Sequence, residues 1–207
     1  MTEKNEKIII KSNGNNKKND DKKDSLWENV LDWIKTIAAA LLIAAFIKGF
    51  IMDATRVSGL SMLNTLYHDD MLLVDKITKR FNDYDRGNIV ILKAPDDDNK
   101  LYVKRAIGIP GDTISLKDDK VFLNGKELDE PYTSVDYTLP EADGTEWTLG
   151  EDEYFVMGDN REEGASNDSR NFGPVNKSEI VGHAFLRFYP FEDFGQIDNN
   201  PYGNETN

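Results

Sequence analysis

The stretch LYVKRAIGIPGD, residues 101–112, gives the strongest signal for the fold. Its first nine residues are mainly apolar, with Lys104 and Arg105 in the middle, and the Pro-Gly-Asp at 110–112 is a turn signal that ends the run. Side chains alternate across a strand, so Lys104 shares a face with Tyr102 while Arg105 points to the other face. We therefore predict a β-strand with one basic residue on each face.

A lysine inside such a strand is a candidate for catalysis. Burial disfavours the charged form, so the pKa of a buried lysine falls below its usual value of about 10.4. A general base needs this lowered pKa. A decrease of about 3 pH units corresponds to about 4 kcal/mol, which only a desolvated site can supply. From this segment alone, a Lys-Arg pair on an exposed strand remains open.

The chain around this stretch has the pattern of a β domain. Short apolar runs separated by turn signals occur at residues 71–74, 88–92, 101–109, 120–123, 154–156 and 181–189. The segment VFLNGKEL, residues 121–128, predicts a hairpin with a type I′ turn at Asn124-Gly125. Since no helix longer than two turns is indicated here, we expect a mainly β, antiparallel domain with its active site on loops and strand ends.

An apolar segment precedes this domain. The run IAAALLIAAFI, residues 37–47, extends with its flanks to about 20 residues, or about 30 Å of helix. Lys35 and Lys48 lie near its ends, where the ammonium groups can reach the headgroups, and Trp27 and Trp33 are placed as interfacial anchors. The pattern predicts a transmembrane helix rather than a buried core helix or a helix lying on the surface.

Basic residues near this span predict its orientation. Lysines stand at positions 17, 18, 22 and 23 before it, whereas only Arg56 stands in the twenty residues after Met52. The positive-inside rule therefore predicts that the helix spans the cell membrane with the N-terminus of the chain in the cytoplasm. We expect a disordered cytoplasmic tail (1–25), a single transmembrane helix with its flanks (26–52), an extracytoplasmic domain (53–194) and a flexible C-terminal tail (195–207).

The composition excludes several kinds of partner and site. The formal net charge is -13, which argues against a nucleic-acid partner because phosphate binding needs an excess of Lys and Arg. The chain has no Cys and only two His, so thiolate zinc sites, disulfides and histidine-rich metal sites are excluded. We expect no cofactor and no metal.

Two further motifs accompany the lysine. The segment VSGLSMLNTL, residues 57–66, contains Ser61, which by itself could be an ordinary polar residue at a strand end. MGDNR at 157–161 and SNDSRNFGPV at 166–175 combine Gly, Asp, Asn and Arg in a manner typical of a rigid hydrogen-bonded loop. Arginines alternate with the acids here, which disfavours a calcium loop.

This combination and its order resemble type I signal peptidases (leader peptidases), of the Gram-positive type. The matching motifs are G-x-S-M-x-x-T-L, Y-V-K-R-x-I-G-x-P-G-D, G-D-N-R and S-x-D-S-R-x-F-G-P-V, and they extend over residues 57–175. The resemblance implies a mainly β, antiparallel catalytic domain of the signal peptidase/LexA-like kind with one N-terminal transmembrane helix. Residues 53–194 are then a serine peptidase domain.

The resemblance also implies roles for single residues. Ser61 is the expected nucleophile and Lys104 its general base. The backbone N–H of Ser61 is the expected oxyanion donor, with Gly59 at the position where some members carry a hydroxyl, and Ser166 is expected to orient the lysine. A supporting ion-pairing group is expected from Asp159, Arg161, Asp168 and Arg170.

The expected activity is cleavage of N-terminal signal peptides from exported preproteins by a membrane-bound serine endopeptidase. The expected partners are signal-peptide-bearing preproteins, the lipid bilayer and the secretion translocon. Three alternatives remain: a non-catalytic relative that binds signal peptides, a peptidase for one particular precursor, and a soluble self-cleaving repressor-like protein. The last gives no reason for the apolar span.

The sequence departs from the family pattern at two places near the site. Asn64 stands where members usually carry Pro, and residues 162–165 contain what looks like a two-residue insertion between Arg161 and Ser166. Asparagine keeps the ability to form a turn but adds freedom. An insertion that moved Ser166 away from Lys104 would lower activity.

Overall fold

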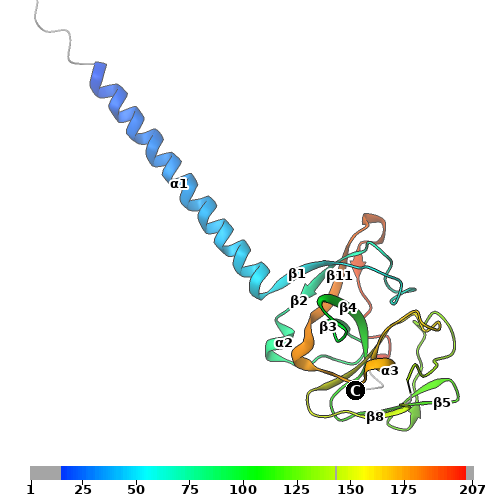
Figure 1. The fold of residues 1–207 in the computed structure, drawn as a ribbon. Helices are drawn as coiled ribbons and strands as arrows, with labels where there is room; N and C mark the ends of the chain where they lie inside the picture. Colours follow the sequence, from blue (N-terminus) through cyan, green and yellow to red (C-terminus); the bar gives the residue numbers. More distant parts are fainter. Residues whose placement is uncertain (1–14, 143, 204–207) are drawn as a thin grey trace, which may run out of the picture. The chain divides into compact units, whose positions relative to one another are not determined.

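The computed structural model describes residues 15–142 and 144–203, in one long helix and a β domain (Figure 1). The chain separates into two units, the second of which is Lys48–Asn207. The helices are α1 (Asn15–Phe50), α2 (Thr78–Phe81), α3 (Ser169–Phe172) and the 3-10 turns η1 (Lys177–Glu179) and η2 (Phe191–Asp193). The strands are β1 (Met52–Arg56), β2 (Met71–Asp75), β3 (Ile89–Ala94), β4 (Asp97–Gly108), β5 (Thr113–Lys117), β6 (Lys120–Leu123), β7 (Lys126–Glu127), β8 (Glu146–Thr148), β9 (Glu153–Met157), β10 (Val175–Asn176), β11 (Ile180–Tyr189) and β12 (Gly195–Gln196).

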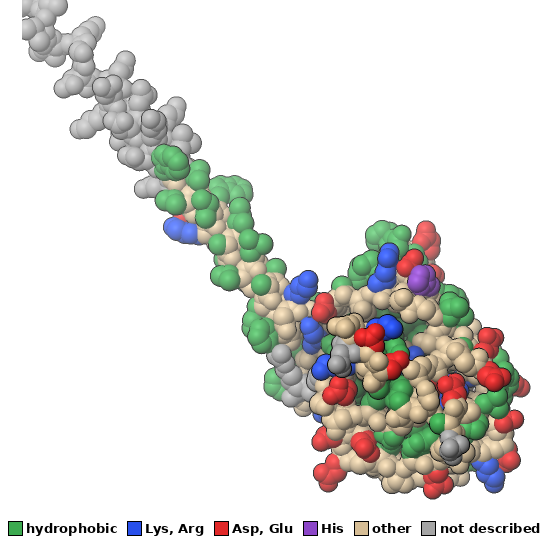
Figure 2. All heavy atoms as spheres, in the orientation of Figure 1, with side chains coloured by type: hydrophobic (Ala, Val, Ile, Leu, Met, Phe, Trp, Pro, Cys, Tyr) green, Lys and Arg blue, Asp and Glu red, His purple; other side chains and the backbone are tan. Residues whose placement is uncertain are grey.

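Helix α1 contains a segment that is long and apolar enough to cross a membrane. This segment runs over 22 residues, Asn29–Phe50, and none of it is buried within the protein. Figure 2 shows hydrophobic side chains along the part of α1 whose side chains are described. Trp27 and Trp33 are both exposed. A stretch of this length and composition fits a single bilayer span.

The helix begins earlier than the sequence pattern indicated. We expected disorder up to residue 25, but residues 15–25 are helical, whereas residues 1–14 lie outside the described part of the chain. Once a helix has formed, each added residue gains one backbone hydrogen bond, so the costly nucleation step is not repeated. Residues 15–25 contain no Gly or Pro, and Gly14 stands immediately before the helix. The expected end of the disordered tail at residue 25 rested on polar composition alone, and it is wrong for residues 15–25.

The β domain has two antiparallel sheets. The larger has the order β1-β2-β11-β3-β4-β9-β10 with β12 paired to β11, and the smaller has the order β7-β6-β5-β8. Strand β4 lies inside the larger sheet between β3 and β9, in a register that pairs Lys104 with Val90 and Arg105 with Ile89. The prediction of a mainly antiparallel β domain after one apolar helix is confirmed.

Both faces of the larger sheet are buried. Along β3, Ile89 and Ile91 pack into one apolar cluster with Met62 and Leu66, whereas Val90 and its neighbours pack into another on the opposite face. Met62 and Leu66 belong to the loop that follows β1, so burial of these two side chains anchors the loop that carries Ser61. The core thus fixes both the strand with the lysine and the loop with the serine.

The predicted hairpin is present between β6 and β7. Asn124 and Gly125 have φ values of 51° and 81°. Positive φ at both central positions is what a type I′ turn requires, and Asn-Gly adopts it at low cost. This prediction is confirmed.

The C-terminal segment is packed, contrary to our expectation of a flexible tail from residue 195. Strand β12 pairs with β11, and the N–H of Ile197 donates to the carbonyl of Phe185. Asn199 makes side-chain hydrogen bonds to the backbone of Ile89 and Ala184. Asn-rich composition suggested looseness, but an Asn side chain can replace a missing backbone partner. Residues 204–207 lie outside the described part.

Candidate active site

Lys104 and Ser61 lie in direct contact. The Lys104 Nζ donates to Ser61 Oγ over 2.9 Å, although the two residues are 43 positions apart. The Nζ also lies 5.2 Å from the centre of the Tyr102 ring, so the two side chains share a face of β4 as the alternation of the strand predicts. The strand and the loop after β1 therefore bring together the two residues that we expected to react.

The Lys104 side chain is kept from water, with 3% of the residue exposed. Burial is the main cause that lowers the pKa of Lys104, from 10.5 to about 8. Among the nearby charges, Asp168 raises this pKa, Arg170 lowers it, and Asp159 and Glu141 raise it. The net effect is an amine that is partly neutral near neutral pH and can accept a proton.

The Ser61 backbone is clamped by Asn160. The N–H of Asn160 donates to the carbonyl of Ser61 over 3.0 Å, and its Nδ2 donates to the carbonyl of Leu60 over 3.1 Å. The sequence contained this asparagine in the G-D-N-R motif, but we assigned it no role. A hydrogen bond between segments far apart in the chain leaves no local sequence pattern. The position of Asn160 within the G-D-N-R motif was therefore the only indication that it has a role in the site.

The backbone N–H of Gly59 is not available as an oxyanion donor, because it already donates a hydrogen bond. Gly59 has φ +110°, which favours glycine, and its N–H donates to His68 Nδ1 over 3.2 Å. Its N–H is therefore already used, and His68 acts on the loop backbone rather than on Ser61. Within the described residues the N–H of Ser61 makes no backbone hydrogen bond, so it is free to receive an oxyanion.

Ser166 lies beside the dyad but is bonded elsewhere. It is buried, and its Oγ donates to Asp168 Oδ2 over 2.7 Å. In the described part of the chain no hydrogen bond joins Ser166 to Lys104, so the expected orienting role of Ser166 stays a prediction. Gly158 lies against both serines, because a Cβ at this position would clash with Ser166 Oγ and with the carbonyl of Ser61. Ser166 thus belongs to the wall of the site.

The two-residue insertion lies in an exposed turn just before Ser166. Residues 162–164 are exposed, the N–H of Ala165 donates to the carbonyl of Glu162, and Gly164 has φ +69°. These features form a solvent-exposed turn that takes up the extra length. Ser166 itself is buried against Gly158.

Asp168 and Arg170 form the first of three buried ion pairs behind the site. Arg170 Nε and Nη2 donate to the two carboxylate oxygens of Asp168 over 2.9 and 2.8 Å. Burial raises the pKa of Asp168, but the hydrogen bonds from Arg170, Gly158 and Ser166 outweigh it and hold the pKa below its ordinary value. Arg170 also lies 3.1 Å from Glu141, whose pKa is raised mainly by burial.

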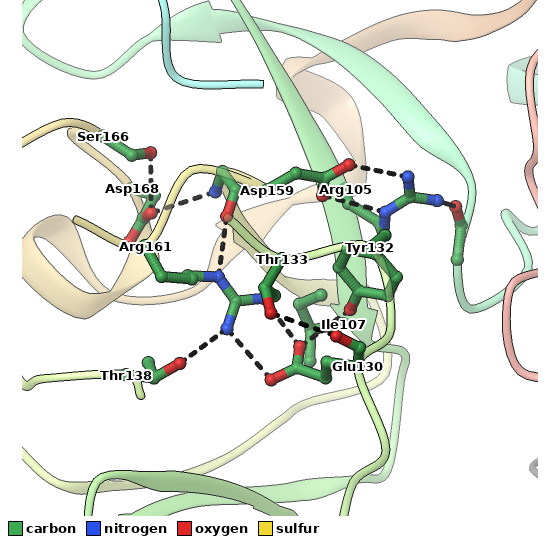
Figure 3. A network of polar contacts seen from close by, with 12 residues as sticks. Arg105, Ile107, Glu130, Tyr132, Thr133, Thr138, Asp159, Arg161, Ser166 and Asp168 are labelled. Carbon is green, nitrogen blue, oxygen red and sulfur yellow. Dashed lines mark hydrogen bonds and ion pairs between the residues drawn. The ribbon is translucent and has the colours of Figure 1, made fainter. Parts of the chain in front are cut away.

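Asp159 forms the second pair, with Arg105 (Figure 3). Arg105 Nε and Nη2 donate to its two oxygens over 2.9 and 2.7 Å, and Thr65 Oγ1 donates to Asp159 over 2.5 Å. Both charged residues are almost fully buried. The alternation along the strand predicted that Arg105 would point to the face opposite Lys104, and the structure shows an acid partner for it, Asp159. Since Thr65 follows Ser61 in the same loop, this pair also fixes the nucleophile loop.

Arg161 forms the third pair, with Glu130, which was not among our candidates (Figure 3). Its two terminal nitrogens donate to Glu130 over 3.0 and 2.6 Å, and its Nε donates to the carbonyl of Gly158 over 2.7 Å. Glu130 lies in a loop without a recognisable motif, so nothing in the sequence singled it out. The four expected ion-pairing residues are thus all buried and paired, but only Asp168 and Arg170 pair with each other, whereas Asp159 and Arg161 pair with residues outside that group.

The described residues offer no obvious metal ligands. Over residues 15–142 and 144–203, no group of three or more His, Cys, Asp or Glu side chains is arranged to hold an ion. The carboxylates around the dyad are instead bonded to arginines. The site consists of a serine, a buried lysine and a hydrogen-bonded frame.

Comparison with known proteins gives the same result as the motifs. The family model "Signal peptidase, peptidase S26" matches residues 30–189. Signal peptidase I of Bacillus licheniformis is 39% identical over 87% of this chain and 98% of its own length. Signal peptidase I S of Bacillus subtilis (strain 168) is 38% identical over 80% and 92%, and signal peptidase IB of Staphylococcus aureus (strain COL) is 35% identical over 81% and 93%.

A solved structure is also similar in sequence. The crystal structure of a signal peptidase I from Enterococcus faecalis V583 is 33% identical and covers 48% of this chain and 94% of that chain, with a TM-score of 0.40. The chain belongs to the signal peptidase family, peptidase S26, as its motifs indicated.

Proposed function

We propose that this chain is a membrane-anchored serine endopeptidase that removes N-terminal signal peptides from exported preproteins with a Ser61-Lys104 dyad. The observation that supports it best is the 2.9 Å hydrogen bond between a buried lysine and Ser61. Its relatives are named signal peptidase I, and the chain covers nearly their whole length.

The first half of the reaction is transfer of the acyl group to Ser61. Neutral Lys104 takes the proton of Ser61 Oγ as this oxygen attacks the scissile carbonyl carbon. The negative charge that develops on the carbonyl oxygen is received by the N–H of Ser61. The lysine, now an ammonium, gives its proton to the leaving amine as the C–N bond breaks. The mature protein departs, and the signal peptide remains as an ester on Ser61.

The second half is hydrolysis of that ester. Lys104, again neutral, removes a proton from a water molecule that attacks the ester carbonyl, and the proton then goes to Ser61 Oγ as the C–O bond breaks. Both halves need the neutral amine. With a pKa of about 8, roughly a tenth of the lysine is neutral at pH 7.

The membrane anchor brings the enzyme to its substrates. The segment Asn29–Phe50 of α1, 22 residues long and apolar on average, supports anchoring in the bilayer, and the lysines before it support a cytoplasmic N-terminus with the peptidase domain outside. A preprotein held in the same membrane by its signal segment is present at a high effective concentration. Contact with the secretion translocon fits this place in export.

The activity is tested with purified full-length protein in detergent and a preprotein that has alanine at the first and third positions before the cut. Wild type should release the mature protein, and Ser61→Ala and Lys104→Ala should each abolish release. Lys126→Ala, which removes an exposed lysine of the hairpin, is the matched control and should cleave normally. Cleavage by either dyad variant contradicts the assigned roles.

The orientation in the membrane is tested by cysteine labelling. The chain has no cysteine of its own, so a single introduced Cys is the only one that can react. A single Cys is placed at Ser12 or at Lys126, and intact cells are treated with a membrane-impermeant maleimide. We expect labelling of Lys126→Cys only, with Ser12→Cys labelled after the membrane is opened. The reverse pattern would contradict the proposed topology.

A further inference from the structure

The last described residues, 195–203, cross the β domain as a C-terminal strap. The strap begins with β12 and follows the segment 30–189 that the family model matches. Its fixed path is therefore not explained by the matched motifs. What it contacts shows what it can do.

Asn199 seats the strap on two strands. Its Oδ1 accepts from the N–H of Ile89 on β3 over 2.7 Å, and its Nδ2 donates to the carbonyl of Ala184 on β11 over 2.9 Å. Pro201 and the carbonyl of Asn199 pack against Gly87, where a Cβ would come within 2.7 and 2.9 Å of them. The strap therefore packs closely against Gly87 and is hydrogen-bonded to both strands.

The seated strap reaches Arg105 by two routes. The carbonyl of Asp198 accepts from Arg105 Nη1 over 3.0 Å. The Tyr202 hydroxyl is hydrogen-bonded to that of Tyr132, and their rings meet edge to face at 5.8 Å. The Tyr132 ring in turn lies 4.2 Å from Arg105 Cζ (Figure 3). The strap therefore restrains the guanidinium both directly and through an aromatic ring.

Arg105 connects these contacts to the nucleophile. It holds Asp159 with two hydrogen bonds and donates to Thr65 Oγ1 over 3.3 Å, and Thr65 belongs to the loop of Ser61. A pocket of about 270 Å³ is lined both by Asn64 and Thr65 of the serine loop and by the strap residues Gly195, Gln196, Ile197 and Asp198. Movement of the strap would therefore move Arg105, and through Arg105 it would displace the loop that carries Ser61.

We infer that the C-terminal strap positions the nucleophile loop for catalysis, with Asn199 and Tyr202 as positioning residues that act through Arg105. This inference rests on the proposed peptidase function. The strap adds no group to the reacting atoms. Its loss should lower kcat, because a small misplacement of the nucleophile costs rate, while KM changes little.

Two neighbouring asparagines give a matched test in the full-length protein. Asn199→Ala removes the seating bonds, whereas Asn200→Ala removes an exposed side chain of the same kind. We expect roughly a tenfold lower kcat for Asn199→Ala, with KM within about twofold of wild type, and wild-type values for Asn200→Ala. Both are measured well below the melting temperature of the variant.

The route through the tyrosines is tested with conservative variants. Tyr202→Phe should lower kcat in the same direction as Asn199→Ala. Adding Tyr202→Phe to Tyr132→Phe should cause no further loss, because both variants remove the same hydrogen bond. Additive losses contradict this route. Truncation after Phe194 removes the whole strap and should lower kcat. Truncation after Gly203 keeps the strap, serves as its control and should leave kcat unchanged.

The inference fails if Asn199→Ala and Tyr202→Phe lower the melting temperature but retain wild-type kcat, since the strap is then only structural. Hydrogen exchange separates this failure from failure of the proposed function. Amides of residues 57–66 should exchange faster in Asn199→Ala than in Asn200→Ala whether or not the protein cleaves preproteins. Equal exchange in the two variants overturns the inference, and lack of cleavage by wild type overturns the function alone.

Discussion

Asn160 holds Ser61 by a backbone hydrogen bond of 3.0 Å between residues 99 positions apart in the chain. The side chain of the same asparagine bonds Leu60 through Nδ2 and accepts from Ser134 through Oδ1. One residue therefore joins the nucleophile loop to two other loops. The G-D-N-R motif, which supplies Asp159 to Arg105, also supplies this clamp.

Removal of the Asn160 side chain should lower the rate of acyl transfer. Asn160→Ala keeps the backbone bond to Ser61 but loses the bonds to Leu60 and Ser134, so the loop gains freedom. We expect a loss of kcat of about 10- to 100-fold. Asn171→Ala removes an exposed asparagine and should behave as wild type. Equal steady-state kinetics of the two variants would show that the backbone bond suffices.

The rate should depend on pH through Lys104. Since neutral lysine is the base, kcat/KM should rise with pH through an apparent pKa of about 8 and level off above it. Glu141 is one of the acids that raise the pKa of Lys104. Glu141→Gln removes this charge, so the rising limb of the profile should move to lower pH.

Glu163→Gln is the matched control for this shift, because Glu163 lies in the exposed turn of residues 162–164. Its profile should overlay that of wild type. A profile of Glu141→Gln that stays in place, or moves to higher pH, contradicts the electrostatic role of Glu141. The readout is the pH at half-maximal kcat/KM, which a uniform loss of folded protein does not move.

The buried lysine should make the protein less stable than its sequence would otherwise allow. A pKa of about 8 in the folded state, against 10.5 for the free group, means that the unfolded state binds more protons between these values. The loss of folding stability caused by the buried lysine is therefore largest below about pH 8, and it becomes smaller as the pH rises towards 10.5. Lys104→Met should therefore abolish cleavage but raise stability at pH 7 by up to about 3 kcal/mol. Denaturant unfolding at pH 7 and pH 10 checks this, and an equal gain at both pH values contradicts it.

The sequence predicted the parts of this protein that depend on local pattern. The alternation around Lys104 indicated a strand with its lysine and arginine on opposite faces, and the apolar neighbours made burial of the amine one of two open readings. Asn124-Gly125 indicated its turn because both residues tolerate positive φ. Each of these inferences needed only neighbouring residues.

Other features depend on contacts between distant segments, so they could not be predicted. Glu130 has no motif, and its pairing with Arg161 exists only because two loops meet. Asn199 stands in a polar tail whose composition suggested looseness, yet it replaces backbone partners on β3 and β11. The exclusive bond of Ser166 with Asp168 rather than with Lys104 depends on side-chain geometry, which motif spacing does not specify.

Asn64 allows a final prediction, because it stands where the family pattern has Pro. Its φ is 83°, and its Nδ2 donates to the carbonyl of Thr133 over 3.1 Å. Proline fixes φ near −65°, so Asn64→Pro cannot keep this backbone and should lose much activity, although it restores the common family residue. Asn64→Gly keeps the left-handed conformation and should retain most activity, and Asn64→Ala should lie between, at a cost of about 1 kcal/mol. Melting temperature and kcat should therefore both decrease in the order Gly, Ala, Pro, and a proline variant as stable and active as wild type would show that the loop does not need this conformation.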